Sequence, residues 1–320
     1  MTEFTESDGI YAVMKNISET GSEYLAVLEK RMAHVFDAAH IAREKLRSSY
    51  GDAPLLELLF SSDDALGDAL ASVPKSSHAA LSGDDPVASI ALRELEKFDM
   101  LCYCKALSAG EKYDAGDVSA ILFGRDGDAA PKNKKIAMLR NFGSGKAFEL
   151  FAAHVRGVEA IYADNFKSVC DAVYLGEAAL AVLPLESSTD GRLDGLYVMM
   201  EKYGLNVLMS CDVVASDGSV TRFALVGRPC GDIPVADDVK FEFRISLSDT
   251  SEISEISDAA EFFGARLDRV DTVPLSYGRD NAHGMIVDMD GADTAGFMTY
   301  MEMRFSQFVP VGIYSHITEE

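Results

Sequence analysis

The order of strand and helix patterns in the C-terminal third restricts the fold of this chain more than any other feature. Residues 239–247 alternate apolar and polar side chains, with Phe241, Phe243 and Ile245 on one side, which indicates a strand with one buried face. The later patterns run helix, strand, strand, helix, strand, at residues 253–263, 270–275, 284–289, 294–308 and 311–315. This βαββαβ order predicts a ferredoxin-like plait.

The middle of the chain also mixes strands with helices. Strand patterns fall at residues 135–139, 179–184, 205–214 and 221–227, and helical patterns at residues 142–155, 165–175 and 193–203. This alternation predicts a parallel or mixed sheet with helices on its faces. Ligands of such sheets bind at the carboxyl ends of strands, where residues 143–146 and 186–191 would both lie. These loops predict either a polar pocket or two exposed turns.

The N-terminal part predicts helices only. From Met14 to Leu46 apolar residues recur three and four apart, which indicates a long amphipathic helix, and further helices are expected at residues 55–73 and 87–107. Cys102 and Cys104 lie about 200° apart around the last of these, so we expect ordinary buried thiols rather than metal ligands.

The charge is distributed unevenly along the chain. Lys and Arg number 12 against 23 Asp and Glu in residues 1–130, 11 against 11 in 131–231, and 6 against 18 in 232–320. Breaker-rich segments lie near both boundaries, which favours three modules. We therefore expect an α+β multidomain protein: a helical module at 1–130, an α/β lobe at 131–231 and the plait at 232–320. One larger domain with drifting charge is the alternative.

The composition of the chain makes some classes of binding partner unfavourable. A net charge of −23 disfavours nucleic acid and anionic membranes, and no apolar run is long enough to span a bilayer. The acidic N-terminus and the five scattered Cys predict a cytoplasmic protein. Residues 141–146 (NFGSGK) resemble a phosphate loop only superficially, because Arg140 and Ala147 replace the required Gly and hydroxyl. We expect no metal and no other cofactor.

The middle module resembles prephenate dehydratases. The segments IAMLRNFGSGKAFELFA, NFKSVCDAVYLGEAALAVLPLESSTDGRLDGLYVMMEKYGLNV and VTRFALVGR resemble, in order, the start, the core signature and the closing strand of that family. The signature's Pro-Ile-Glu-Asn-Ser becomes residues 184–188 (PLESS), and the Thr-Arg-Phe that supplies the family's catalytic Thr stands at 221–223. The resemblance implies catalytic roles for Glu186, Ser187 and Thr221. It implies ligand-binding roles for Gly143, Ser144, Ser188, Gly191, Arg222 and Phe223.

One segment departs strongly from the family. Its members insert a second lobe before the Thr-Arg-Phe strand, and here the five residues Ala215–Ser219 bridge that gap. A turn of this length cannot contain the lobe that forms the opposite wall of the family's catalytic cleft. Because dehydration needs groups positioned on both sides of the substrate, we expect dehydratase activity to be lost.

The predicted plait resembles the ACT regulatory domain that follows the catalytic domain in this family and binds phenylalanine. The family's two binding motifs correspond to positions near Asp249 and near Ser276 and Arg279, which makes these three residues regulatory candidates. A plait used only for dimerisation is the alternative.

The N-terminal helix resembles the chorismate mutase module of bifunctional members. Residues 25–43 (LAVLEKRMAHVFDAAHIAR) resemble the mutase's first helix, with Arg31 on a basic position of that family and Arg43 about 120° further around the axis. These two arginines are the mutase-like candidates. The basic residues from Lys30 to Arg47 are more simply explained as a solvated face of the helix.

The resemblance leads to three hypotheses. The first is a divergent relative of bifunctional chorismate mutase/prephenate dehydratase, linked to phenylalanine biosynthesis, that senses a ligand or regulates and has lost dehydratase activity. The second is an active enzyme, more readily a chorismate mutase than a prephenate dehydratase. The third is a structural subunit that modulates an active paralogue. The expected ligand is phenylalanine, prephenate or a chorismate-like compound, and the expected assembly is a homodimer through the ACT-like domain and the N-terminal helices.

Overall fold

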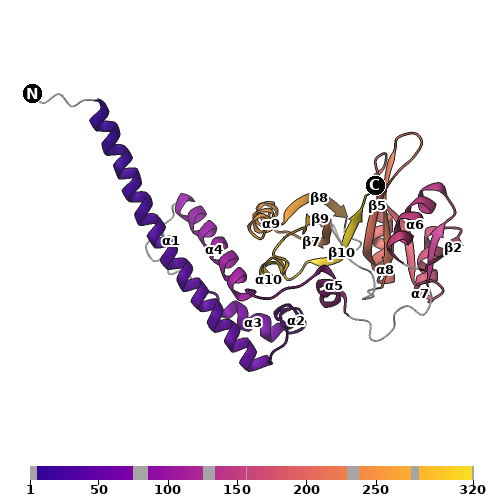
Figure 1. Cartoon of the computed structure of the whole chain (residues 1–320), viewed down its shortest axis with the longest axis horizontal. Helices are drawn as coiled ribbons and strands as arrows, with labels where there is room; N and C mark the ends of the chain where they lie inside the picture. Colours follow the sequence, from indigo (N-terminus) through magenta and orange to yellow (C-terminus); the bar gives the residue numbers. More distant parts are fainter. Residues whose placement is uncertain are drawn as a thin grey trace, which may run out of the picture. The chain divides into compact units, whose positions relative to one another are not determined.

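The computed structural model describes residues 6–74, 86–124, 134–155, 157–228, 238–274 and 281–318. Contacts divide the chain into two compact units. Residues 1–53 and 62–109 form the first unit, and residues 54–61 and 110–320 form the second. Figure 1 shows the helices of the first unit in indigo to magenta and the sheet of the second in colours from pink through orange to yellow.

The first unit is helical, as predicted. The long helix α1 (Glu6–Tyr50) packs on α3 (Asp63–Ala71) and α4 (Pro86–Leu107). Its described core positions follow the predicted spacing and are Val35, Ala39, Ala42 and Leu46. Cys102 and Cys104 are both buried, as predicted, and burial raises the pKa of the Cys102 thiol to about 11.

The helix predicted at residues 55–73 is two helices. Ser62 interrupts it, because its extended backbone begins α3 and its hydroxyl accepts the N–H of Ala65 at 3.2 Å. The segment before it, α2 (Leu55–Ser61), belongs to the second unit together with α5 (Ala115–Phe123). Phe60 of α2 packs edge-on against Phe308. The expected module boundaries near residues 130 and 231 fall outside the described residues and stay predictions.

The second unit contains one sheet, in the order β2-β1-β3-β6-β5-β10-β7-β9-β8, with β4 paired to β3. Its strands are β1 (Lys135–Leu139), β2 (Glu159–Ala163), β3 (Leu180–Ser187), β4 (Gly191–Arg192), β5 (Asn206–Val214), β6 (Val220–Gly227), β7 (Val239–Ile245), β8 (Arg266–Pro274), β9 (Asn281–Asp288) and β10 (Val309–Ile317). The remaining helices are α6 (Phe142–His154), α7 (Phe166–Tyr174), α8 (Asp194–Tyr203), α9 (Ser251–Phe262) and α10 (Thr294–Phe305).

Residues 134–228, here called the lobe, form a mixed sheet covered on both faces, as predicted. β1 is parallel to β2 and β3, whereas β6 is antiparallel to β3 and β5. Phe151 of α6 lies in the core on one face, and Val169 of α7 and Tyr197 of α8 lie in the core on the other. The edge strand β2 was not expected, because its side chains show neither a buried run nor a regular alternation.

Residues 238–318, here called the plait, have the predicted βαββαβ order. Their strands pair in the order β10-β7-β9-β8, and every pair is antiparallel. This is the strand arrangement of a ferredoxin-like plait. Phe241 and Phe243 stack on each other with ring centroids 4.9 Å apart, and both are fully buried, as the alternation of β7 predicts.

The lobe and the plait share this sheet because β10 pairs in parallel with β5. The strands approach closely at Gly312, where a Cβ atom would lie within van der Waals overlap of the Val207 carbonyl oxygen. Only glycine fits there. The join places side chains of the plait beside the polar end of the lobe.

Candidate functional site

A β-bulge in β3 determines where the signature carboxylate points. Pro184 pairs with Phe223 and Glu186 pairs with Arg222, so Leu185 is an extra residue in the ladder. Such a bulge re-aims the residues that follow it. Glu186 therefore shares a face with Arg222, whereas the next pair, Ser187 and Thr221, points to the other face.

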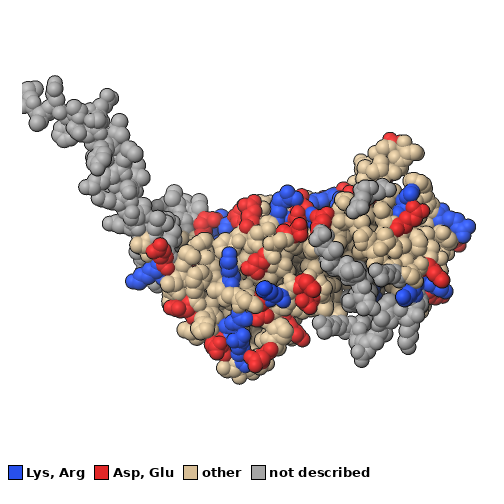
Figure 2. All heavy atoms as spheres, viewed as in Figure 1, with Lys and Arg blue, Asp and Glu red and all other residues tan. Residues whose placement is uncertain are grey.

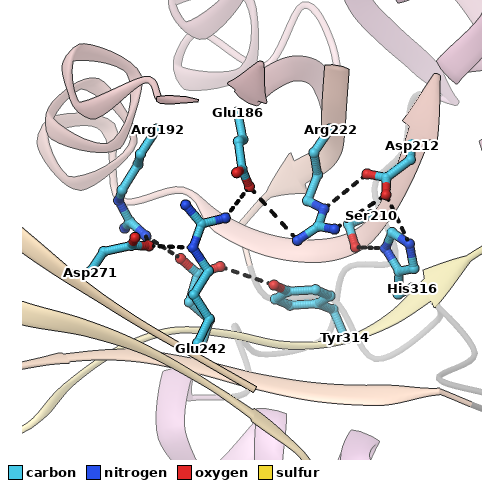
Figure 3. A network of polar contacts seen from close by, with 10 residues as sticks. Glu186, Arg192, Ser210, Asp212, Arg222, Glu242, Asp271, Tyr314 and His316 are labelled. Carbon is cyan, nitrogen blue, oxygen red and sulfur yellow. Dashed lines mark hydrogen bonds and ion pairs between the residues drawn. The ribbon is translucent and has the colours of Figure 1, made fainter. Parts of the chain in front are cut away.

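Charged side chains form a row across four strands on the Glu186 face. Arg222 of β6 is paired with Asp212 of β5 on one side and Glu186 of β3 on the other, and Glu186 is paired with Arg192 of β4. The Arg222 guanidinium donates to both oxygens of Asp212, at 2.9 and 3.2 Å, and lies 3.9 Å from Glu186 (Figure 3). Burial alone would raise the pKa of Asp212, but the hydrogen bond and charge of Arg222 lower it below 3.8.

The plait supplies the second set of charges. Arg269 of β8 donates from Nη1 to Glu186 Oε2, and its Nε lies 2.7 Å from Asp271 Oδ2. Arg269 and Glu186 are both about one-quarter exposed. The carboxylate of the lobe's signature is thus held by an arginine of the plait.

A buried layer supports this network (Figure 3). Glu242 of β7 is 1% exposed, accepts a hydrogen bond from the Tyr314 hydroxyl at 3.0 Å, and lies 3.3 Å from Arg192. Arg192 also stacks on Tyr197, 3.6 Å from its ring centroid. Burial raises the pKa values of Tyr197 and Tyr314 well above the ordinary value, so both hydroxyls stay protonated. The buried Glu242 carboxylate therefore has the Tyr314 hydroxyl as hydrogen-bond donor and Arg192 as its cation.

A pocket of about 370 Å³ opens beside this network. It is lined from both the lobe and the plait, by Ser210, Arg222, Asp238, Lys240, Asp268, Arg269, Ile286, Tyr314 and His316. Three cations, two carboxylates and two apolar surfaces face one space. Lys240 Nζ lies 2.9 Å from Asp238 Oδ1 and 3.0 Å from Asp268 Oδ2, so this cation and the two carboxylates already form ion pairs within the lining.

His316 links β10 of the plait to β5 of the lobe. Ser210 and His316 are register partners on β5 and β10, and the Ser210 hydroxyl lies 2.9 Å from His316 Nδ1. His316 Nε2 lies 3.6 Å from Asp212 Oδ2. Burial lowers the pKa of His316 below 6.5, and Arg222 adds to this whereas Asp212 opposes it. His316 is therefore neutral at pH 7.

The hydroxyl residues of the signature bond locally. The hydroxyls of Ser187 and Thr189 lie 2.7 Å apart, and Ser188 exchanges two hydrogen bonds with the Val220 backbone. Gly191, at φ +70°, forms the turn between β3 and β4. Thr221 lies opposite Ser187. The structure brings these residues together, but not with the carboxylate of Glu186.

The first candidate loop lies on the α6 face. A Cβ atom on Gly143 would lie 2.7 Å from the Phe223 ring, so the close approach of α6 to β6 requires glycine. Asn141 caps α6 by accepting the Ser144 N–H at 2.8 Å. Ser144 is fully buried, and its hydroxyl has no hydrogen-bond partner among the described residues.

The described mutase-like and regulatory candidates make local contacts within their own parts of the chain. Arg31 makes a bidentate pair with the buried Asp99 of α4, with Nε 2.7 Å from the carboxylate. Arg43 donates to the Leu107 and Ala109 carbonyls at the end of α4. Asp249 accepts the Ser251 N–H at 2.9 Å where α9 begins. Ser276 and Arg279 lie outside the described residues.

Glu186 and Arg222 were predicted from the sequence, but their partners were not. Asp212, Arg269 and His316 come from strands that are distant in sequence, and no local motif links them. Lys240 and Glu242 alternate with the buried Phe residues of β7, a pattern that normally marks a solvent-exposed face. Only the pairing of β5 with β10 brings this face against the lobe.

Neither a metal site nor a membrane span is found among the described residues. Within the part of the chain that the structure describes, no cluster of His, Cys, Asp and Glu is arranged to hold a metal ion. Among the same residues no helix has both the length and the apolar character that a membrane span requires. On the face seen in Figure 2, Lys and Arg lie among Asp and Glu, so a phosphate backbone there would meet carboxylates between the basic residues.

No protein-family model matches this sequence, and no curated protein matches it. Solved structures with a similar arrangement include the prephenate dehydratase of Streptococcus mutans, at TM-score 0.47 and 17% identity over 57% of this chain and 99% of that one. A prephenate dehydratase from Arthrobacter aurescens in complex with L-Phe matches at TM-score 0.42 and 13% identity, over 57% and 90%. GqqA, described as a novel type of quorum quenching acylase, matches at TM-score 0.44 and 18% identity, over 57% and 95%.

Proposed function

We propose that this chain binds a small amino-acid-like ligand in the pocket between the lobe and the plait, and that it regulates phenylalanine biosynthesis without prephenate dehydratase activity. The observation that supports this most directly is the contact between Arg269 of the plait and Glu186 of the lobe. A ligand beside this contact touches both parts at once, so its binding changes how firmly they are joined.

The placement of the signature residues argues against dehydration. Glu186 lies on one face of the sheet and Ser187 and Thr221 on the other, so the carboxylate and the two hydroxyls point away from each other. The short turn at residues 215–219 joins β5 directly to β6, with the Ala215 N–H bonded to the Ser219 carbonyl at 2.8 Å. A connection of this length contains no second lobe between β5 and β6.

The pocket has the chemistry of an amino-acid site. Arg222, Arg269 and Lys240 line it together with Asp238 and Asp268. A bound amino acid would replace the ion pairs of Lys240 with Asp238 and Asp268, its carboxylate meeting the cation and its ammonium group meeting the carboxylates. Ile286 and the Tyr314 ring provide the apolar surface. Phenylalanine carries both charges that this lining can pair with, and the motif resemblance connects the chain to phenylalanine biosynthesis. The plait then has the role of an ACT-like regulatory domain.

Thermal melts of the full chain with phenylalanine, tyrosine, prephenate and chorismate test this proposal. A ligand that binds only the folded state raises the midpoint, by linkage to about 2.7 kcal/mol of stability at a hundred times its Kd. Arg269→Ala should abolish the rise, and Arg304→Ala is the matched control, because Arg304 pairs with Glu255 elsewhere in the plait.

The same protein is assayed for conversion of prephenate to phenylpyruvate by ultraviolet absorbance. We expect no turnover above the uncatalysed rate. Turnover would overturn the loss of dehydratase activity, and the absence of any midpoint shift at millimolar ligand would overturn the binding role.

A further inference from the structure

The pocket contains a second arrangement that ligand binding does not require. The His316 imidazole contacts both Ser210 and Asp212. Ser210 Oγ lies 2.9 Å from its Nδ1, and Asp212 Oδ2 lies 3.6 Å from its Nε2. The three side chains come from adjacent strands, β5 and β10, on one face of the sheet. Figure 3 shows the imidazole between the hydroxyl and the carboxylate.

We propose that Ser210, His316 and Asp212 form a nucleophilic triad that accepts an acyl group from a small, negatively charged ester or amide bound in the pocket. A triad is recognised by the roles of its groups rather than by its fold or chain order. Here Ser210 is the nucleophile, His316 is the general base, and Asp212 orients the imidazole. The imidazole uses Nδ1 towards the serine, the reverse of the usual arrangement.

The contacts of His316 favour the protonation state that a general base requires. A carboxylate beside Nε2 favours the tautomer with the proton on Nε2, which leaves the lone pair of Nδ1 to accept the Ser210 hydroxyl. Burial lowers the pKa of His316, so the neutral base is present at pH 7. Arg222 fixes Asp212 through two hydrogen bonds. The 3.6 Å approach to Nε2 is longer than a hydrogen bond, as is common for catalytic groups before substrate binds.

The surroundings determine which substrates reach the nucleophile. Ser210 is 1% exposed and lines the pocket, so only a molecule that enters the pocket can reach its hydroxyl. Arg222, Arg269 and Lys240 line the same space and favour a substrate with negative charge.

The reaction balances with water as the second substrate. Ser210 Oγ bonds to the acyl carbon while its proton passes to His316 Nδ1. When the bond to the leaving oxygen or nitrogen breaks, that atom takes the proton from Nδ1. Water then attacks the acyl-serine, gives one proton to Nδ1, and releases the acid as that proton returns to Ser210 Oγ.

A fluorophosphonate probe tests the nucleophile directly on the full chain. Ser210 Oγ would bond to phosphorus with loss of fluoride, and mass spectrometry of the digested protein would locate the adduct. We expect an adduct on the peptide that contains Ser210, none in Ser210→Ala, and labelling about a hundredfold slower in His316→Gln. Ser48→Ala and His154→Gln, which alter exposed helix positions, are the controls and should label like the unmodified chain.

The labelling result distinguishes the proposed triad from the proposed binding of an amino acid. Absence of the adduct on Ser210, or equal labelling of His316→Gln, overturns the triad even if phenylalanine still raises the melting midpoint. Hydrolysis of 4-nitrophenyl hemisuccinate, compared with 4-nitrophenyl acetate, reports the preference for a charged acyl group. Equal rates for the two esters would contradict the role given to the cations.

Discussion

Arg269 of β8 donates a hydrogen bond to Glu186 of β3, although the two residues lie in different parts of the sheet and 83 positions apart in sequence. This contact is formed because β10 pairs with β5 and brings the polar face of the plait against the end of the lobe. The glutamate that the sequence motif would assign to catalysis is thereby a connection between two parts of the fold.

A double-mutant cycle on Arg269→Ala and Glu186→Ala should show that the two residues stabilise the fold together. Both side chains are only partly buried, so we expect a coupling free energy of about 1 kcal/mol in urea denaturation. Arg304→Ala with Glu255→Ala gives the comparison within the plait. Additive effects of Arg269→Ala and Glu186→Ala would show that the contact does not join the lobe to the plait.

Arg192→Met should destabilise the second unit strongly. The change removes the cation beside Glu242, a carboxylate that is 1% exposed, and leaving a buried charge without its partner costs about 3–5 kcal/mol. The double variant Arg192→Met with Glu242→Met should recover most of this loss, because no unpaired charge stays buried. Denaturant midpoints of the unmodified chain and the two variants decide the matter, and a double variant no more stable than Arg192→Met would contradict the account.

Gly312→Ala tests the junction of the two strands. The added methyl would overlap the Val207 carbonyl oxygen, so the strands must separate, and overpacking of this kind costs about 1–3 kcal/mol. Gly145→Ala is the control: it lies in α6 with open space around its Cβ position, and alanine there should stabilise by up to about 1 kcal/mol. Equal effects of the two changes would mean that β5 and β10 are not so close.

The free energy of unfolding should fall as the pH drops from about 8 to about 5. Because burial lowers the pKa of His316 below 6.5, the unfolded chain binds more protons than the folded chain in this range, and stability decreases with falling pH. Asp212 adds to the loss only near and below pH 3.8, since its pKa is also lowered in the fold. His316→Gln should reduce the slope between pH 8 and pH 5 in urea denaturation. An unchanged slope would place the titrating groups elsewhere.

The fold was predictable where a single element carries its own pattern. The alternation of Phe241 and Phe243 predicts β7, and the three-four spacing around Val35 predicts α1, because each element buries one face. The strand β2 and the division at Ser62 were missed. An edge strand has no buried run, and a cap depends on one backbone conformation that propensity does not reveal.

The site was predictable only in part. The motif resemblance identified Glu186 and Thr221 together, but the bulge at Leu185 separates them onto opposite faces. A bulge depends on strand register, which a pattern of side chains in one strand does not contain. The burial of Glu242 likewise follows from a pairing between β5 and β10, more than a hundred residues apart in sequence.

The most direct test of the pocket is calorimetric titration of the full chain with L-phenylalanine at neutral pH. We predict saturable binding of one ligand per chain that Lys240→Ala and Arg269→Ala each weaken at least about tenfold, whereas Arg304→Ala leaves it unchanged. Binding that is equally strong in all three variants would place the ligand elsewhere, and absence of binding to the unmodified chain would contradict phenylalanine as its ligand.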